Sequence, residues 1–100
     1  MKHQAVLLLL VSSAAFAFAY DHPRLARADV IRMANVEARR HGYDLHAYER
    51  PDAHFNYVEK DNTWVIFYEG KAVNGMTTVG NHFTVHIDDR TKEIWLIPGR

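Results

Sequence analysis

Hydrophobic residues in the first half of the chain recur at the spacing of an α-helix. One side of this predicted helix carries Val30, Ile31, Ala34 and Ala38, and the opposite side carries Asp29, Arg32 and Arg39. Before it, Asp21-His22-Pro23 is typical of a helix entrance, and Gly42 is suited to the exit. We predict one amphipathic helix between them, with an alanine-rich stripe that favours close approach to a sheet.

From Phe55 onward the hydrophobic period changes to two residues, which is typical of β-strands. The first strand begins at Phe55, and we expect a two-residue turn at Asp61-Asn62 before a second strand over Thr63–Glu69. In the second strand, Trp64, Ile66 and Tyr68 alternate with Val65 and Phe67. Because both sets are apolar, we predict a central strand with both faces at least partly covered.

Two further strands follow a long connection over residues 70–80, which has Asn74-Gly75 in its middle. The third strand carries Phe83, Val85 and Ile87 on one side. A turn over 88–92 leads to a last strand over 93–97, which Pro98-Gly99 ends. The pattern predicts an α+β fold in which one N-terminal helix packs on a four-stranded antiparallel sheet, with residues 43–53 as an irregular link.

The first nineteen residues have the layout of a secretory signal peptide. Lys2 gives a positive start, residues 5–11 form an apolar run, and Ala17-Phe18-Ala19 supplies small residues for a signal peptidase. We predict cleavage after Ala19, with Ala17 as the alternative, and a periplasmic or secreted protein whose residues 20–100 form a single domain. The apolar run is shorter than the roughly 20 residues of a membrane span, so no stable span is expected after cleavage.

Composition narrows the choice of partners. Removal of residues 1–19 leaves 81 of the 100 residues, with 11 Lys and Arg against 12 Asp and Glu, a net charge of −1 with neutral histidines. Because these charges are interleaved along the chain, nucleic acid is not expected as a partner. Cysteine is absent, so neither disulfides nor a lipid-anchored cysteine is possible, which fits a bacterial periplasm.

A family resemblance rests on two stretches that follow the helix. These are Trp64-Val65-Ile66-Phe67 and Phe83-Thr84-Val85-His86-Ile87-Asp88-Asp89-Arg90-Thr91. The chain resembles the PepSY and cystatin-like groups of small exported domains, in which a sheet wraps one helix, although Lys92 stands where the PepSY turn usually carries glycine. The resemblance implies a binding module of the cell envelope and, for some relatives, an inhibitory contact with a peptidase. It implies no catalytic residue.

The mature chain offers few groups for catalysis. It contains neither serine nor cysteine, and an N-terminal threonine nucleophile would need threonine as the first mature residue. Asp88-Asp89 is the obvious carboxylate pair. Adjacent residues at the end of a strand point apart, however, so we expect a solvated turn there. We therefore predict that the protein is not an enzyme.

Histidines His82 and His86 share one face of the third strand with Thr84 and Asp88. Four residues along a strand span about 13 Å. Two imidazoles on one zinc ion must bring their nitrogens within about 4 Å, so a shared site would need partners such as His54 from other strands. We expect a polar sheet face instead, with His82 and His86 as binding residues.

We predict no cofactor. The alternative is copper or nickel bound at the mature N-terminus. If cleavage follows Ala19, the mature chain begins Tyr20-Asp21-His22. Its amine, two deprotonated backbone amides and the His22 imidazole would supply four nitrogens in the square-planar arrangement that Cu(II) and Ni(II) prefer. The other interpretation of His22 is a helix-entry residue before Pro23.

Aromatic residues are numerous, and we assign most of them to the core. Trp64 and Phe83 are among these core residues, together with the aliphatic Ile87. Tyr48 in the link, and Met76 and Val79 in the long loop, are predicted contact residues.

Two functional classes remain open. The first is a non-catalytic module that recognises an envelope protein or peptide, a peptidase among them. The alternative is an envelope protein that binds a small ligand in a pocket between helix and sheet, or copper or nickel. The oligomeric state is left open.

Overall fold

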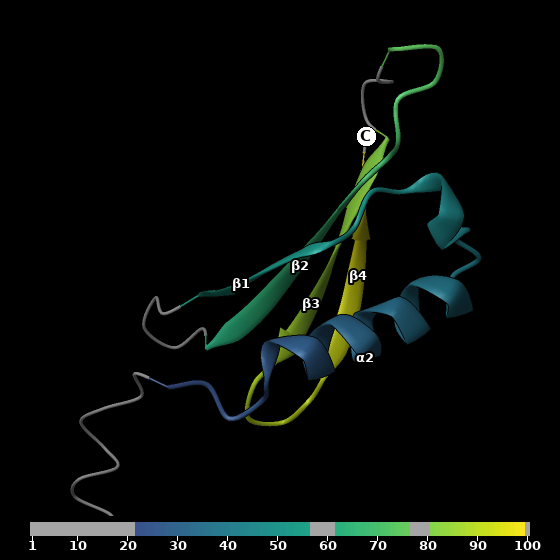
Figure 1. Ribbon diagram of the computed structural model, residues 1–100. Helices are drawn as coiled ribbons and strands as arrows, with labels where there is room; N and C mark the ends of the chain where they lie inside the picture. The colour runs from purple at the N-terminus through teal and green to yellow at the C-terminus, as the bar shows by residue number, and fades with distance from the viewer. Residues whose placement is uncertain (1–21, 57–61, 77–80, 100) are drawn as a thin grey trace, which may run out of the picture.

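The computed structural model describes residues 22–56, 62–76 and 81–99. Its elements are α2 (Arg27–Arg40), the short 3₁₀ helix η1 (Leu45–Ala47), β1 (Asp52–Asn56), β2 (Thr63–Glu69), β3 (His82–Asp88) and β4 (Ile94–Pro98). The strands form one antiparallel sheet in the order β1-β2-β3-β4, and α2 lies across one side of it (Figure 1). The predicted α+β fold is confirmed. The predicted signal peptide lies outside the described residues.

The core lies between α2 and the inner side of the sheet. Val30, Ala34 and Ala38 of the helix are fully buried, as predicted, because the small alanine side chains allow close approach to the strands. The sheet contributes Trp64, Ile66, Tyr68, Phe83, Val85 and Ile87. The rings of Tyr68 and Phe83 are stacked, with centroids 4.4 Å apart. The core roles predicted for Trp64, Phe83 and Ile87 are confirmed.

The two ends of α2 differ in how well they were predicted. At the exit, Gly42 has φ +90°, its N–H donates to the Arg39 carbonyl at 2.9 Å, and the Tyr43 N–H donates to the Ala38 carbonyl at 3.1 Å. These two bonds form a Schellman motif, so the predicted exit is confirmed. The predicted entrance is wrong. The helix begins at Arg27, after an N-cap residue, Ala26, whose side chain makes no capping bond.

The segment before α2 is held by a buried carboxylate instead. Asp89 is only 1% exposed, and it accepts hydrogen bonds from the backbone N–H groups of Arg24 (2.6 Å) and Leu25 (2.9 Å) and from Trp64 Nε1 (3.1 Å). The predicted solvated turn is therefore wrong for Asp89. Asp88, by contrast, is half-buried and accepts two backbone hydrogen bonds inside the β3–β4 turn, from Arg90 and Thr91.

The pairing of β1 with β2 also differs from the prediction. A two-residue turn at Asp61-Asn62 would pair residue 60 with Thr63, but Thr63 pairs with Asn56. This register sets Phe55 opposite Trp64, with ring centroids 5.3 Å apart, so core packing selects it. Asp61 itself lies outside the described residues. β1 also begins three residues earlier than predicted, and the link before it contains η1.

Both turns beside β3 contain residues with positive φ. In the loop after β2, Asn74 (φ +54°) and Gly75 (φ +79°) form a tight turn within the predicted connection, and Val73 and Met76 exchange two backbone hydrogen bonds across it. This loop extends beyond the end of the sheet (Figure 1). After β3, the turn contains Lys92 at φ +65°. Among the described residues, no helix has the length and apolar character needed to cross a membrane.

Candidate functional site

The side of the sheet opposite α2 carries one set of alternate side chains from each strand. Strand pairing places Val65, His86 and Trp95 in one cross-strand row and Phe67, Thr84 and Ile97 in the next, with His82 beside Glu69. We call these residues the open face: Val65, Phe67, His82, Thr84, His86, Trp95 and Ile97. The side chains that alternate with them on β2 and β3 belong to the buried core. The prediction of a central strand with both faces at least partly covered is confirmed, since β2 lies between β1 and β3, Val65 is half-buried and Phe67 is 37% exposed.

The open face exposes three large apolar side chains. Phe67 is 37% exposed, Trp95 39% and Ile97 47%. Histidine rings lie against these aromatic groups. The His86 ring is stacked on Trp95 at a centroid distance of 5.4 Å, and the His82 ring lies 5.6 Å from Phe67. The face therefore offers aromatic and aliphatic contact area with imidazole nitrogens among it.

The predicted polar face with His82 and His86 is confirmed in part. The two histidines do share a face, but its main exposed surface comes from Phe67, Trp95 and Ile97, which were not predicted as binding residues. The alternation of residues in β2 indicated this contribution of Phe67, because it placed Phe67 on the face that does not carry the core residues. What was missing was that no described element covers that side.

Strand pairing also keeps the histidines of the sheet apart. His54 pairs with Val65, and Val65 pairs in turn with His86, so two inter-strand spacings, about 10 Å, separate His54 from His86. His54 instead lies 2.8 Å from Asp52 Oδ2. Within the described residues, no three side chains of His, Cys, Asp or Glu are grouped closely enough to hold a metal ion.

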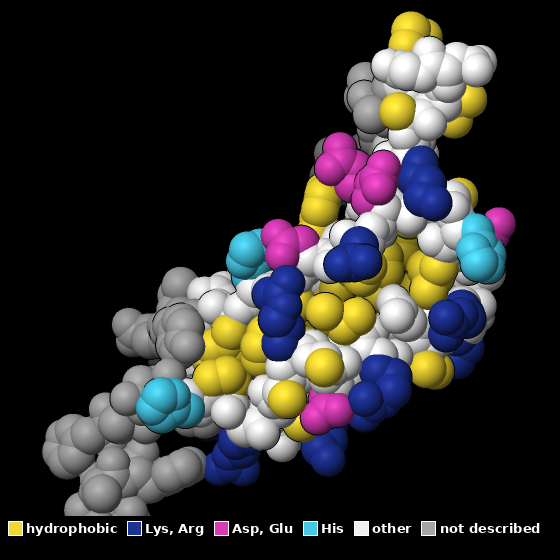
Figure 2. Space-filling model, viewed as in Figure 1, with side chains coloured by type: hydrophobic (Ala, Val, Ile, Leu, Met, Phe, Trp, Pro, Cys, Tyr) yellow, Lys and Arg dark blue, Asp and Glu magenta, His cyan; other side chains and the backbone are white. Residues whose placement is uncertain are grey.

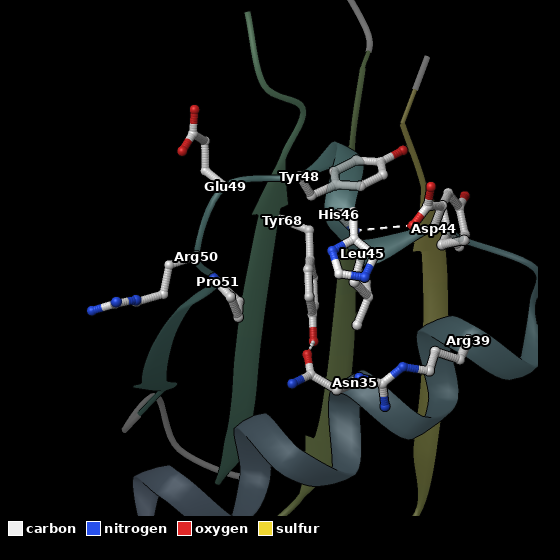
Figure 3. Close-up of a pocket in the computed structure, with 11 residues that line it drawn as sticks. Asn35, Arg39, Asp44, Leu45, His46, Tyr48, Glu49, Arg50, Pro51 and Tyr68 are labelled. Atoms are coloured by element: carbon white, nitrogen blue, oxygen red, sulfur yellow. Dashed lines mark hydrogen bonds between the residues drawn. The ribbon is translucent and has the colours of Figure 1, made fainter.

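A second candidate site lies on the helix side of the sheet. A cavity of about 380 Å³ opens between α2, residues 43–51 and β2 (Figure 3). We call it the tyrosine pocket, and its lining is Asn35, Arg39, Tyr43, Asp44, Leu45, His46, Tyr48, Glu49, Arg50, Pro51 and Tyr68. On this side of the molecule, hydrophobic side chains are visible between Lys and Arg side chains (Figure 2).

One hydrogen bond defines the floor of the tyrosine pocket. The hydroxyl of Tyr68, a residue only 1% exposed, donates to Asn35 Oδ1 at 2.6 Å, and Figure 3 shows the two side chains pointing toward each other. Burial raises the pKa of Tyr68 well above its ordinary value, while the positive charge of Arg39 acts in the opposite direction. The hydroxyl therefore remains a protonated donor at neutral pH.

The link forms the opposite wall. Asp44 caps η1 by accepting the His46 N–H at 3.0 Å, which holds Leu45 and His46 over the pocket (Figure 3). Tyr48 packs edge-on against Phe83, with centroids 5.0 Å apart. Tyr48 is half-buried, and it is both a pocket residue and a support for the core. Its role as a contact residue stays a prediction.

The structure does not bring the predicted binding residues into one site. Tyr48 lies on the helix side of the sheet, and His82 and His86 lie on the open face. Met76 is 72% exposed in the loop beyond the sheet, as predicted, and Val79 lies outside the described residues. Of the predicted metal residues, His22 is exposed, and Tyr20 and Asp21 lie outside the described residues. The copper or nickel site stays a prediction.

Comparison with known proteins finds no family model, no curated protein and no solved structure that matches this chain. The resemblance to PepSY and cystatin-like domains therefore stays a prediction. Function is inferred from the open face and the tyrosine pocket, which lie on opposite sides of the sheet.

Proposed function

We propose that this chain is a non-catalytic module of the cell envelope that binds a protein or peptide partner through the open face. One observation carries the proposal: three large apolar side chains, Phe67 on β2 and Trp95 and Ile97 on β4, are each more than a third exposed on the open face, with Thr84 and His86 of β3 between them. Large apolar side chains exposed together on one face of a sheet are typical of sites that another protein covers.

The composition of the open face suits a binding surface. Tryptophan and phenylalanine provide large rigid contact area, and tryptophan is enriched among the residues that dominate binding energy. Polar groups border them, since Asp52 and Glu69 occupy the same side of the sheet. An apolar centre with a polar border is the usual anatomy of a protein interface.

One pair on this face has the elements of a nucleophile and a base. Thr84 Oγ1 lies 3.1 Å from His86 Nε2, a distance at which an imidazole can accept the hydroxyl proton. The two residues lie two positions apart on β3 in the open face, and neither lines the tyrosine pocket. Catalysis needs a concave site that orients the substrate, so we assign the pair to binding.

Site-specific photo-cross-linking tests the proposal. A photoreactive amino acid replaces Ile97 on the open face of the exported protein, and the variant is exposed to an envelope extract of its native cells. We expect one discrete covalent adduct, and the substitutions Phe67→Ser and Trp95→Ser should each weaken it by about tenfold or more, as loss of a central interface residue does. Circular dichroism checks that each variant keeps the fold.

One further position serves as a control, and another tests the loop of residues 70–80. Val36 is a hydrophobic residue of α2 that is 58% exposed, and a cross-linker there should give no such adduct. A cross-linker at Met76 tests the loop that the sequence predicted as a contact surface. An adduct that forms equally from Val36, or one that Phe67→Ser and Trp95→Ser leave unchanged, contradicts binding at the open face.

A further inference from the structure

The tyrosine pocket has the size and position of a ligand site that is separate from the open face. Its volume of about 380 Å³ falls in the range of small-molecule pockets. It lies on the helix side of the sheet, so binding there does not depend on the proposed function of the open face. Its floor and its walls have different chemistry, and this difference indicates the class of ligand.

The floor presents hydrogen-bond donors. The Tyr68 hydroxyl donates to Asn35 Oδ1 and so uses one lone pair of that oxygen, while the Asn35 Nδ2 group retains two N–H donors. Among the described residues, Asn35 Nδ2 has no hydrogen-bond partner. The floor therefore offers two N–H donors to an acceptor group of a ligand.

A cation lies next to these donors. Arg39 follows Asn35 by one helical turn, so both side chains are on the same face of α2. Figure 3 shows the Arg39 side chain extending along α2 toward Asn35. Within the part of the chain that the structure describes, Arg39 forms neither a hydrogen bond nor an ion pair. The combination of a free guanidinium with amide donors suits a carboxylate, which accepts several hydrogen bonds through two oxygens.

The walls suit the rest of the ligand. Tyr43, Leu45, Tyr48 and Pro51 give aromatic and aliphatic surface. The acidic residues of the lining, Asp44 and Glu49, belong to the link rather than to α2, and Glu49 points away from Tyr68 (Figure 3). The link also carries Arg50, which points away from Tyr68 as Glu49 does (Figure 3). The α2 side of the lining therefore has a cation and no carboxylate, which favours an orientation in which the negative end of a ligand faces α2.

We infer that the tyrosine pocket binds a monocarboxylate with a short aromatic or aliphatic body. The carboxylate accepts hydrogen bonds from Arg39 and from Asn35 Nδ2, and the apolar body packs against Tyr43, Leu45 and Tyr48. The same chemistry occurs in a free organic acid and in the C-terminal residue of a peptide, and the test below distinguishes these two sources.

Calorimetric titration of the exported protein with matched acids and amides tests the inference. The first probes are 3-phenylpropionate and 3-phenylpropionamide, which differ in the charge of one group. We expect saturable binding of the acid, and binding of the amide weaker by about tenfold or more, because the charge-assisted bonds are lost. Equal affinity for acid and amide, or no binding of the acid up to about 10 mM, overturns the inference.

Two substitutions place the carboxylate in the pocket. Asn35→Asp keeps an acceptor for the Tyr68 hydroxyl but replaces the Nδ2 donors by a negative oxygen, so it should abolish binding of the acid without loss of the fold. Arg39→Gln should weaken binding by about tenfold, and Arg39→Lys should restore part of it. Arg32→Gln on the same helix is the control, because Arg32 does not line the pocket and pairs with Asp29. Unchanged binding by Asn35→Asp contradicts the inference.

The source of the carboxylate is settled with a second pair of probes. Acetyl-Ala-Phe carries a free C-terminal carboxylate, and its C-terminal amide lacks one. Tighter binding of this peptide acid than of 3-phenylpropionate assigns the pocket to peptide C-termini, whereas weaker binding assigns it to free organic acids. Both results support a carboxylate site. Equal binding of the peptide acid and its amide contradicts it.

Discussion

The indole Nε1–H of Trp64 donates a hydrogen bond to the buried Asp89 carboxylate at 3.1 Å. The same carboxylate accepts the backbone N–H groups of Arg24 and Leu25, so it joins β2, the end of β3 and the segment before α2. Three donors would lose their partner if this carboxylate were removed. Asp89 is therefore the polar group on which the position of the N-terminal segment depends.

Replacement of this carboxylate should be costly. We expect Asp89→Ala to lower the free energy of unfolding by about 2–4 kcal/mol, because buried N–H donors are left unsatisfied. Urea denaturation measures the loss, and hydrogen exchange at the Arg24 and Leu25 amides should become faster. Asp52→Asn, a change at an exposed carboxylate, is the control and should have a much smaller effect. Unchanged amide exchange in Asp89→Ala would contradict the anchoring role.

Stability should fall in acid partly through Glu37. The side-chain hydrogen bond from Arg40 lowers the pKa of Glu37 below its ordinary value of 4.5, and His41 adds to this effect. The folded state thus favours the charged carboxylate. Its contribution is complete above pH 4.5 and is lost as the pH falls through the lowered pKa.

Urea denaturation at a series of pH values measures this contribution. Glu37→Gln should show a shallower loss of stability below pH 4.5 than the unaltered protein. The loss will not vanish, because the Arg27 hydrogen bond to Asp52 and the Thr91 N–H bond to Asp88 lower the pKa values of these carboxyl groups as well. Glu49→Gln is the control, since the Glu49 side chain has no hydrogen bond among the described residues. An identical pH profile for Glu37→Gln and the unaltered protein would contradict the prediction.

The turn after β3 contains a backbone conformation that favours glycine. Lys92 has φ +65°, which places a side chain close to the following carbonyl. Lys92→Gly should therefore raise the free energy of unfolding by about 0.5–1 kcal/mol. Lys71→Gly at an exposed loop residue with ordinary φ should instead lower it slightly, because glycine adds freedom to the unfolded chain. Thermal denaturation of the two variants compares them, and a loss of stability in Lys92→Gly would refute the strain.

Copper binding at the mature N-terminus has a natural control. A chain that begins at Tyr20 has His22 in third position and should bind one Cu(II), with the visible absorption of a four-nitrogen site. A chain cut after Ala17 begins at Phe18 and has Tyr20 in third position, so it should lack that absorption. Mass spectrometry of the exported protein identifies which end exists. A Tyr20 chain without the absorption excludes the site.

Local pattern predicted much of this fold because each element depends on residues close in sequence. The two-residue alternation in β2 and β3 follows from strand geometry, and the Gly42 exit follows from the freedom of glycine at positive φ. The start of α2 and the register of β1 were missed for the opposite reason. Both are set by distant partners, namely Asp89 for residues 24 and 25 and Trp64 for Phe55.

The candidate sites show the same division. The sequence by itself determined that His82 and His86 share a face, since residues four apart on a strand must do so. Only the tertiary structure decided that Phe67, Trp95 and Ile97 remain exposed beside them, because exposure depends on which side of the sheet α2 covers. Only the tertiary structure, too, set Tyr68 against Asn35 on α2, a hydrogen bond between residues 33 positions apart. Such contacts depend on how the helix and sheet pack, and this is decided by the summed burial of the whole core rather than by any local pattern.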